Sequence, residues 1–448
     1  MRIAMWTPLL VGACSFTAAT GDNIDARKVD AARADAPIDA PPGCDTLTCS
    51  GKTLICETQQ VPCDISCSTT GGAHCTQFTP SNGADWTDLA TVANGTGDLN
   101  VTEDILVSTD TGGITTRLNA TVIRSTGEGV NNGYRFRIIS DKVSLLAFDD
   151  LTIAAAAKVR VTGNHALIIL ARNTITILGE IDADGGRNAD PAQAGPGGGT
   201  GAVGASPAGG CGFGPNGQFN DPNASGGAGG SFGRRGGDGG GNTATPGGIA
   251  AVACTESLKL KLQGGSGGGR GGELNEGGSG GGGGGAIQFT AGREISVAGL
   301  LHSGGAGGTS SRNKKGGGGA GAGGGFLFEA PTVNLLASAT VVTNGGGGGD
   351  GKDGGNNNDP NKTNGETGQP DLTAAKGGPK ADGNAGNGGN GGVTDTPPGP
   401  GSGNPNMGSG GGGGGIGKIE IQCVNLSPIT SGAKVSPLTP TITTLVGM

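Results

Sequence analysis

The stretch LTIAAAAKVRVTGNHALIILARNTITILGEIDADGG, residues 151–186, contains five short segments in which apolar residues alternate with other residues. These apolar pairs are Leu151/Ile153, Val159/Val161, Leu167/Ile169, Ile175/Ile177 and Ile181/Ala183. Alternation with a period of two puts both members of a pair on one face of a β-strand. The linkers are too short for crossover helices, and short strands with tight corners are typical of a stacked solenoid. The stretch therefore predicts an all-β fold, a right-handed parallel β-helix.

The same pattern recurs further along the chain. Leu167, Ile169, Ala171, Ile175, Ile177, Gly179, Ile181 and Gly185 return 120 positions later as Ile287, Phe289, Ala291, Ile295, Val297, Gly299, Leu301 and Gly305. A third copy carries Phe326, Phe328, Ala330, Val333, Leu335 and Val341, and a looser fourth copy carries Ile419, Ile421, Cys423, Leu426 and Val435. Each copy is too short to bury a core of its own, so the repetition favours stacked turns over duplicated globular domains.

Weaker strand signals precede the quoted stretch. They are Leu99/Val101, Ile105/Val107, Thr121/Ile123, Phe136/Ile138 and Val143/Leu145. We interpret them as the first turns of the β-helix, with Trp86 and its neighbours as an N-terminal cap. The predicted β-helix, with its insertions, spans residues 81–440.

Composition limits the possible functions. The 448 residues include 101 glycines and only 3% aromatic residues, which leaves little material for a bulky core. The net charge is −8, and the Lys and Arg residues are scattered, so no basic surface for nucleic acid is indicated. No apolar run has the length of a membrane-spanning helix.

Glycine-rich insertions follow the same point of three copies. They cover residues 184–285, 304–325 and 345–417, and we expect all three to leave the β-helix at one corner and to run side by side. Glycine often recurs at every third position, as in Gly227, Gly230, Gly233, Gly236 and Gly239; Gly345, Gly348, Gly351 and Gly354; Gly383, Gly386, Gly389 and Gly392. This spacing fits close packing of threefold polyproline-II-like chains. Flexible, solvated loops are the alternative that the sequence leaves open.

The N-terminal residues predict export and a lipid anchor. Residues 1–13 hold one basic residue and a short apolar run, followed by Cys14. Val11-Gly12-Ala13-Cys14 resembles the bacterial lipobox, which implies a signal peptide and acylation of Cys14. Residues 15–42 are rich in Asp, Ala and Pro and are expected to form an extended tether.

A cysteine-rich module is predicted over residues 43–80. It contains Cys44, Cys49, Cys56, Cys63, Cys67 and Cys75. Six cysteines behind an export signal favour a disulfide framework whose pairing is open, and only His74 hints at the alternative, zinc. In the first insertion, a Cys211–Cys254 disulfide would leave Cys423 as a buried thiol in the last turn.

Together, these features resemble a group of glycine-rich lipoproteins of myxobacteria, often labelled PE-PGRS-like. The shared features are the lipobox, the tether, a cysteine module and a β-helix with glycine-rich insertions. The cysteine module ends near His74-Cys75 and is followed by Phe78 and by the sequence PSNG at residues 80–83. The N-terminal Pro-Glu domain of true PE-PGRS proteins is absent from this sequence. The resemblance implies a β-helical lipoprotein of the bacterial cell envelope, in the outer membrane, and implies no established activity.

The sequence favours a structural or adhesive surface protein without catalytic activity or cofactor. Its expected partners are the membrane, through the anchor, and other cell-surface proteins or extracellular polysaccharide, with no nucleic acid. The alternative is a carbohydrate-processing β-helix enzyme using the carboxylates of Asp149, Asp150, Asp182 and Asp184. Of the polygalacturonase motifs only the DD pair is present. One GGxGxD match, residues 345–350, is too isolated to predict calcium, and no metal site is expected.

Overall fold

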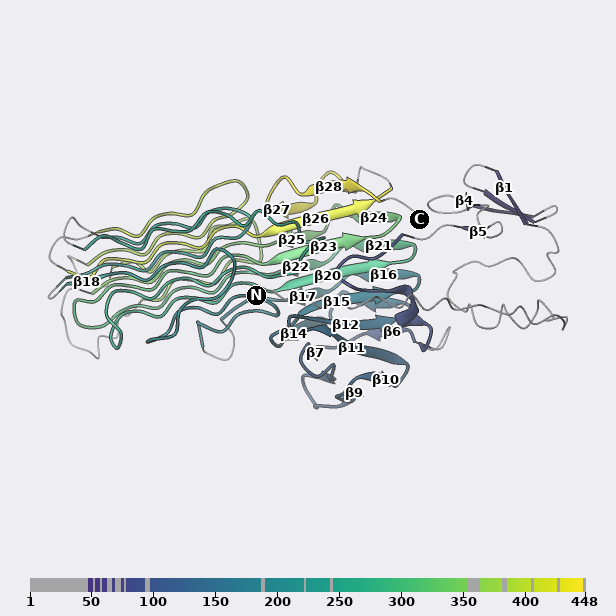
Figure 1. The fold of residues 1–448 in the computed structure, drawn as a ribbon, viewed down its shortest axis with the longest axis horizontal. Coiled ribbons are helices and arrows are strands. Elements are labelled where there is room, and N and C mark those ends of the chain that lie inside the picture. Colours follow the sequence, from purple (N-terminus) through teal and green to yellow (C-terminus); the bar gives the residue numbers. More distant parts are fainter. Residues whose placement is uncertain are drawn as a thin grey trace, which may run out of the picture.

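The computed structural model describes residues 47–50, 53–56, 59–62, 67–68, 74–75, 78–92, 97–186, 190–220, 223–241, 245–352, 363–380, 385–403, 407–424 and 428–445. Regular structure in these residues is almost all β-strand, with one short 3₁₀ helix, η3 (Trp86–Leu89). The strands stack in one part of the molecule, and long glycine tracts extend from it to one side (Figure 1).

Most strands belong to three sheets, whose central parts are parallel. Sheet I contains β10 (Gly129–Asn131), β11 (Tyr134–Ser140), β12 (Val143–Phe148), β15 (Ala166–Ala171), β20 (Ala286–Ala291), β23 (Gly325–Glu329), β26 (Lys418–Cys423) and β28 (Thr441–Thr444). Sheet II contains β6 (Leu99–Val101), β13 (Leu151–Ile153), β16 (Thr174–Ile177), β21 (Glu294–Val297) and β24 (Thr332–Leu335). Sheet III contains β7 (Ile105–Ser108), β8 (Ile114–Thr116), β9 (Val122–Arg124), β14 (Lys158–Thr162), β17 (Glu180–Asp182), β22 (Leu300–His302), β25 (Thr340–Val342) and β27 (Lys434–Ser436).

From β12 to β26, consecutive strands visit sheets I, II and III in that order, apart from two short strands of the first insertion, and from β13 onward each of them pairs with the strand of the same sheet one turn earlier. The last turn departs from this order, because β26 is followed by β27 of sheet III and then by β28 of sheet I. The register is the one that the repeats predict. Leu167 pairs with Ile287, Ile175 with Ile295, and Ile181 with Leu301. The third and fourth copies follow the same alignment through Phe326 and Ile419, Phe328 and Ile421, and Val341 and Val435. The prediction of stacked repeats is therefore confirmed for these turns.

The apolar residues of the repeats form one continuous core between the three sheets. Ile177, Ile295 and Val333 are fully buried members of this core. Phe289 and Phe328 on neighbouring strands of sheet I stack with their ring centroids 5.3 Å apart. Stacking of identical positions lets every turn bury its apolar face against the turns before and after it.

The early strands differ from the prediction. Strands β6, β7 and β12 join the parallel sheets, but β8 and β9 extend sheet III as antiparallel strands, and β10 and β11 do the same for sheet I. The reason is local turn chemistry: Asn132 and Gly133, both with positive φ, form the two-residue turn of the β10–β11 hairpin. The guanidinium of buried Arg124 donates to several backbone carbonyls there, including those of Gly112 and Gly129.

Contrary to our expectation, Trp86 does not cap the end of the stack. The segment 78–92, which contains η3, packs against the outer face of sheet I, where Leu89 and Val92 join a second apolar cluster with Leu145 and Ile168. Outward residues of β12 and β15 are apolar, so this face requires a cover. The segment 78–92 is therefore a lateral cover.

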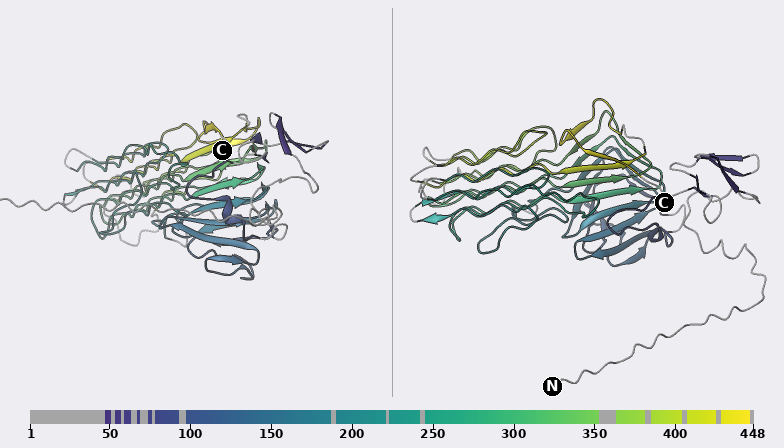
Figure 2. Two further views of the ribbon diagram at one scale, coloured as in Figure 1. Left: turned by 45° about the vertical axis from the view of Figure 1, so that its right-hand side comes forward. Right: turned by 45° about the horizontal axis from the view of Figure 1, so that its top comes forward.

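The three glycine insertions leave from one corner, as predicted. Each one connects a strand of sheet III to the next strand of sheet I: β17 to β20, β22 to β23, and β25 to β26. They extend together to one side of the stacked strands in all views of Figures 1 and 2, and in Figure 1 this side lies opposite the labelled strands of sheet II. We call this assembly of tracts the glycine bundle.

The glycine bundle is held together by backbone hydrogen bonds that repeat every third residue. In tract 316–325, the backbone N–H groups of Gly318, Gly321 and Gly324 donate to the backbone carbonyls of residues 309, 306 and 303, respectively. Those of Gly317, Ala320 and Gly323 donate to residues 409, 412 and 415, and those of Gly319 and Ala322 donate to residues 269 and 266. The N–H groups on the three faces of tract 316–325 thus form hydrogen bonds with three different neighbouring tracts. This is the arrangement expected for chains with threefold symmetry. The alternative of solvated loops is wrong for the described tracts.

The period-three glycines of the sequence make these contacts. Gly345, Gly348 and Gly351 donate to the carbonyls of residues 392, 389 and 386, so the second and third predicted series bond each other. Gly354 and Gly383 lie outside the described residues. Near the surface, Asn side chains accept the backbone N–H groups instead: Asn390 accepts from Gly377, and Asn387 from Lys380.

Three small sheets contain the remaining strands of the described residues. In the cysteine module, β1 (Leu47–Ser50), β2 (Thr53–Cys56) and β3 (Gln59–Pro62) form an antiparallel sheet, and β4 (Cys67–Ser68) pairs with β5 (His74–Cys75). In the first insertion, β18 (Phe219–Asn220) pairs with β19 (Asn223–Ala224). Cys211 and Cys254 form the expected disulfide, and Cys423 is buried in β26, where burial raises the pKa of its thiol.

Candidate functional site

Asp149 has a structural environment. It follows β12, is almost fully buried, and its carboxylate accepts a hydrogen bond from Arg172 Nε at 2.7 Å. Arg172 also donates to the carbonyls of Leu89 and Val92. The pair therefore joins the lateral cover to the corner between sheets I and II, and a buried carboxylate engaged in this way is not available to a substrate.

Asp150 lies beside Asp149 but is partly exposed, directly before β13 of sheet II. Its carboxylate accepts hydrogen bonds from the backbone N–H and hydroxyl of Thr174 and from the amide of Asn173. It also lines an open groove of about 490 Å³. The residues lining this groove are Asp98, Asn100, Asp150, Thr152, Asn173, Thr174 and Arg293.

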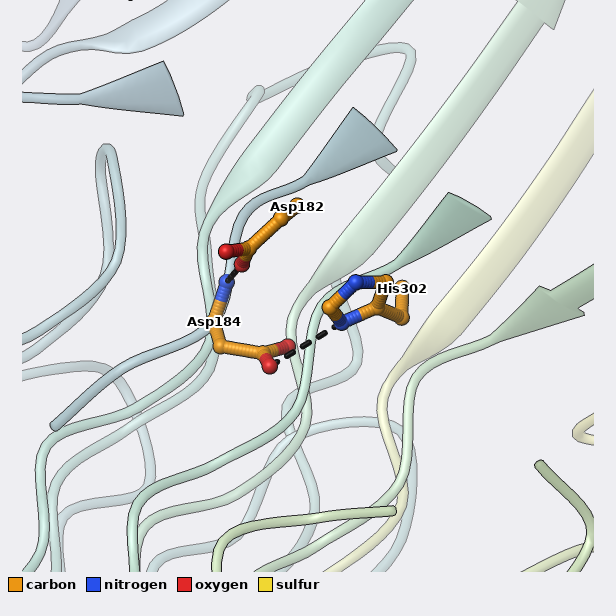
Figure 3. Close-up of side chains that lie close together, drawn as sticks. All are labelled: Asp182, Asp184 and His302. Atoms are coloured by element: carbon orange, nitrogen blue, oxygen red, sulfur yellow. Dashed lines mark hydrogen bonds and ion pairs between the residues drawn. The ribbon is translucent and has the colours of Figure 1, made fainter. Parts of the chain in front are cut away.

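The other two predicted carboxylates, Asp182 and Asp184, lie at the corner where the first glycine insertion leaves sheet III. Figure 3 shows them with His302, which the parallel pairing of β17 and β22 places opposite Asp182. His302 Nδ1 lies 2.9 Å from Asp184 Oδ2. Asp182 accepts from the backbone N–H of Asp184 at 3.0 Å and from Arg160 Nε at 3.0 Å.

Glu180 extends this group into a charged ladder across three strands. Its carboxylate lies 3.2 Å from His302 Nε2 and 2.7 Å from Lys158 Nζ. We call Lys158, Arg160, Glu180, Asp182, Asp184 and His302 the corner cluster. The alternation of cations and carboxylates along it pairs the charges that the corner places close together.

The corner cluster shifts the pKa of two groups. The hydrogen bond from His302 is the largest influence that lowers the pKa of Glu180 to about 2. Burial opposes the charged form of His302, but the charge of Asp184 and hydrogen bonds to Asp184 and Glu180 outweigh it and raise the pKa to about 10. His302 is therefore an imidazolium at neutral pH, with both ring nitrogens donating to carboxylates.

The side chains of Asp182, Asp184 and His302 are close enough together for a metal ion. However, a histidine binds metal only through a deprotonated ring nitrogen, and the carboxylates here stabilise the protonated ring. The geometry fits an ion-pair network better than a metal centre. The GGxGxD residues fit calcium no better, because Lys352 Nζ lies 3.6 Å from the Asp350 carboxylate inside the glycine bundle.

The four predicted carboxylates thus occupy two different corners of the sheets. Asp149 and Asp150 lie between sheets I and II, whereas Asp182 and Asp184 lie between sheets III and I. Sequence reasoning missed His302 as their partner, although the repeat register of 120 residues already aligned it with Asp182.

Several predicted sites lie outside the described residues or side chains. Cys14, Cys44 and Cys63 are outside the described residues. The strand backbone is described for Cys49, Cys56, Cys67 and Cys75, with Cys67 paired opposite Cys75. The pairing of these six cysteines stays a prediction.

Comparison with known proteins identifies no relative. The chain matches no protein-family model, no curated protein and no solved structure. In the part of the chain that is described, we find no helix long and apolar enough to span a membrane.

Proposed function

We propose that this protein is a lipid-anchored structural or adhesive protein of the bacterial cell surface. The observation that carries the proposal is the glycine bundle, in which backbone hydrogen bonds between tracts build an ordered protrusion beside the stacked sheets. A rigid protrusion of this kind provides reach without a bulky core, which suits contact between surfaces.

We also propose that the stacked sheets form a right-handed parallel β-helix. The fixed order in which the chain visits sheets I, II and III supports a coil. A crossover connection between two parallel strands of the same sheet is right-handed in about 98% of cases, which supports that hand.

The surface of the first insertion supports an adhesive role. It carries the exposed apolar side chains Phe213, Ile249 and Val252, which are 46%, 69% and 80% exposed. Tracts 211–217 and 247–254 lie side by side, because Gly212 faces the carbonyl of Val252, and the Cys211–Cys254 disulfide joins their ends. Exposed apolar groups held on a rigid frame are typical of interaction surfaces.

Anchoring is tested by metabolic labelling with a palmitate analogue. We expect label in the wild-type protein and none in the Cys14→Ala variant, because acylation requires the cysteine thiol. Equal labelling of the two proteins would rule out the anchor at Cys14.

The adhesive role is tested with cells that express surface variants. We expect the Phe213→Ser/Val252→Ser variant to reduce cell cohesion at an unchanged protein level. Leu118→Ser is the control, because Leu118 is 86% exposed and lies outside the insertions. Full cohesion with the double variant, or an equal loss with the control, would contradict the proposal.

The alternative, a carbohydrate-processing enzyme, is favoured only by the groove beside Asp150. An acid and a base must flank one glycosidic bond, and Asp182 and Asp184 lie at another corner. Asp98 and Asp150 are the two carboxylates in the groove lining, so they would have to serve as the acid and the base. Release of sugar ends from a polysaccharide by wild type, and its loss in Asp98→Asn, would establish the enzyme and overturn the non-catalytic proposal.

A further inference from the structure

The outer face of sheet II carries only polar side chains in its strands. Every strand of the sheet alternates between buried apolar residues and outward residues. The outward residues are Asn100, Thr152, Thr174, Thr176, Glu294, Ser296, Thr332 and Asn334. All are short except Glu294, so their polar groups stay close to the surface of the sheet.

The parallel register aligns these residues in two rows that cross the strands. One row contains Asn100, Thr152, Thr176, Ser296 and Asn334, and the other contains Thr174, Glu294 and Thr332. Neighbouring strands are about 4.8 Å apart. A row therefore offers hydroxyl and amide groups at short, regular intervals, which suits a ligand that is itself repetitive and rich in hydrogen-bonding groups.

The groove beside Asp150 lies over the first turns of these rows. Asn100 and Thr152 belong to the first row, and Asp98, Asn173 and Arg293 add planar polar groups at the edge. Carboxylate, amide and guanidinium groups can each make two hydrogen bonds with adjacent acceptors or donors, such as neighbouring hydroxyls of a sugar ring. The other strands then continue the polar surface beyond the groove.

The charge of this face selects among polysaccharides. Among the described residues that line the groove or point outward from the strands, Asp98, Asp150 and Glu294 contribute three carboxylates, and Arg293 contributes one guanidinium. A chain of uronic or sulfated sugars would be repelled. We propose that the outer face of sheet II binds a neutral polysaccharide, with the chain lying across the strands along the polar rows.

The position of sheet II leaves this face accessible to a ligand. The outer face of sheet I is covered by the segment 78–92 and by Leu258 and Leu262 of the first insertion. The glycine tracts leave the stack directly after β17, β22 and β25, which are strands of sheet III. Sheet II is on the side away from the glycine bundle (Figure 1). One molecule can therefore hold a glycan on one side and make a second contact with the bundle on the other.

This inference deepens the proposed adhesive function by naming the class of partner. The groove lining contains no aromatic side chain on which a sugar could stack, so each site should bind weakly. Many anchored copies facing one long polysaccharide would raise the overall affinity, because after the first contact the remaining contacts form at high local concentration.

Binding is tested with the purified full chain carrying Cys14→Ala, by ligand-observed saturation-transfer NMR and calorimetry. The probes are cellohexaose, laminarihexaose and maltohexaose, with hexagalacturonate as the charged comparison. We expect at least one neutral hexasaccharide to bind and hexagalacturonate not to bind. The Asn100→Ala/Arg293→Ala variant should lose about tenfold in affinity, the loss expected for one or two hydrogen bonds.

The control variant is Thr340→Ala/Lys434→Ala, which removes outward groups from sheet III and should bind as wild type. Absence of signal with all three neutral sugars would overturn the proposal. So would stronger binding of hexagalacturonate, or unchanged affinity in the sheet II variant. Because this assay uses isolated protein, its outcome is separate from the loss of cohesion tested with Phe213→Ser/Val252→Ser cells.

Discussion

At the scale of single residues, the glycine bundle depends on missing side chains. Gly321 is buried, and a Cβ atom there would lie 2.0 Å from the carbonyl oxygen of Gly282. Two positions of the same tract, Ala320 and Ala322, do carry methyl groups, and Ala322 packs with Phe232, Leu258 and Leu327. Glycine is therefore required only at those positions of a tract where a neighbouring backbone leaves no room for a Cβ atom.

We expect Gly321→Ala to destabilise the protein by roughly 3 kcal/mol, because a backbone carbonyl cannot move aside as a side chain can. Gly399→Ala is the matched control, since a Cβ there would be 3.1 Å from its nearest neighbour, the backbone N of Asn390. Thermal unfolding of both variants measures the difference. Equal midpoints would mean that close packing of the tracts does not contribute to stability.

A second residue-scale prediction concerns the pH dependence of the corner cluster. The pKa of Glu180 is lowered to about 2, so its contribution to stability is lost as the pH falls from about 4.5 towards 2. The pKa of His302 is raised to about 10, so its contribution is complete below about 6.5 and is lost as the pH rises towards 10. The cluster thus stabilises the fold most between these two ranges.

His302→Asn should cost about 3 kcal/mol at pH 6, since it leaves the carboxylates of Asp184 and Glu180 without their buried cation. It should also flatten the decline in stability between pH 6.5 and pH 10. Urea unfolding of wild type and variant across this range provides the measurement. If both proteins lose stability in parallel on the alkaline side, His302 is not the titrating group.

At the scale of elements, the segment 78–92 explains the PSNG motif of residues 80–83. The hydroxyl and N–H of Ser81 donate to the buried carboxylate of Glu329. The Asn82 side chain donates to Gln288 and to the carbonyl of Leu258, and it accepts from the N–H of Leu262. The motif thus fastens the chain that follows the cysteine module to sheet I and to the first insertion at once.

Asn82→Gly should loosen this segment, because it removes all three side-chain contacts while glycine accepts the positive φ of 58°. We expect a loss of about 2 kcal/mol and faster hydrogen exchange over residues 78–92. Asn132→Gly is the control, since Asn132 also has a positive φ but makes one contact, with the carbonyl of Ile123. Unchanged exchange in Asn82→Gly would show that apolar packing alone holds the segment.

At the scale of the whole molecule, stability is shared between stacked turns. Ile177 is fully buried in β16, whereas its neighbour Thr176 points outward from the same strand. Ile177→Asp should prevent stable folding of the stack, because the carboxylate would have only aliphatic neighbours. Thr176→Asp should fold normally. Circular dichroism and hydrogen exchange distinguish them, and equal protection in both would refute a shared core.

The same stacking explains what the sequence could predict. Alternation with a period of two identified β16 and β21, and their spacing of 120 residues was enough to set their register. The common exit corner of the insertions followed from that register. These features depend on local alternation and on identical neighbours one turn away, so a linear sequence records them directly.

Only the tertiary structure decided the remaining features. The strand signals around Ile123 and Phe136 became antiparallel hairpins, because alternation is the same in parallel and antiparallel strands. The apolar runs of β12 and β15 mark a sheet that is buried on both faces, but they do not show that the segment around Trp86 covers the outer one. Ordered packing of the glycine tracts was undecided, because glycine composition suits both loops and close packing. The contacts that decide between these two outcomes join backbone groups far apart in the chain. The period-three spacing of glycine is compatible with these contacts but does not determine which tracts bond each other.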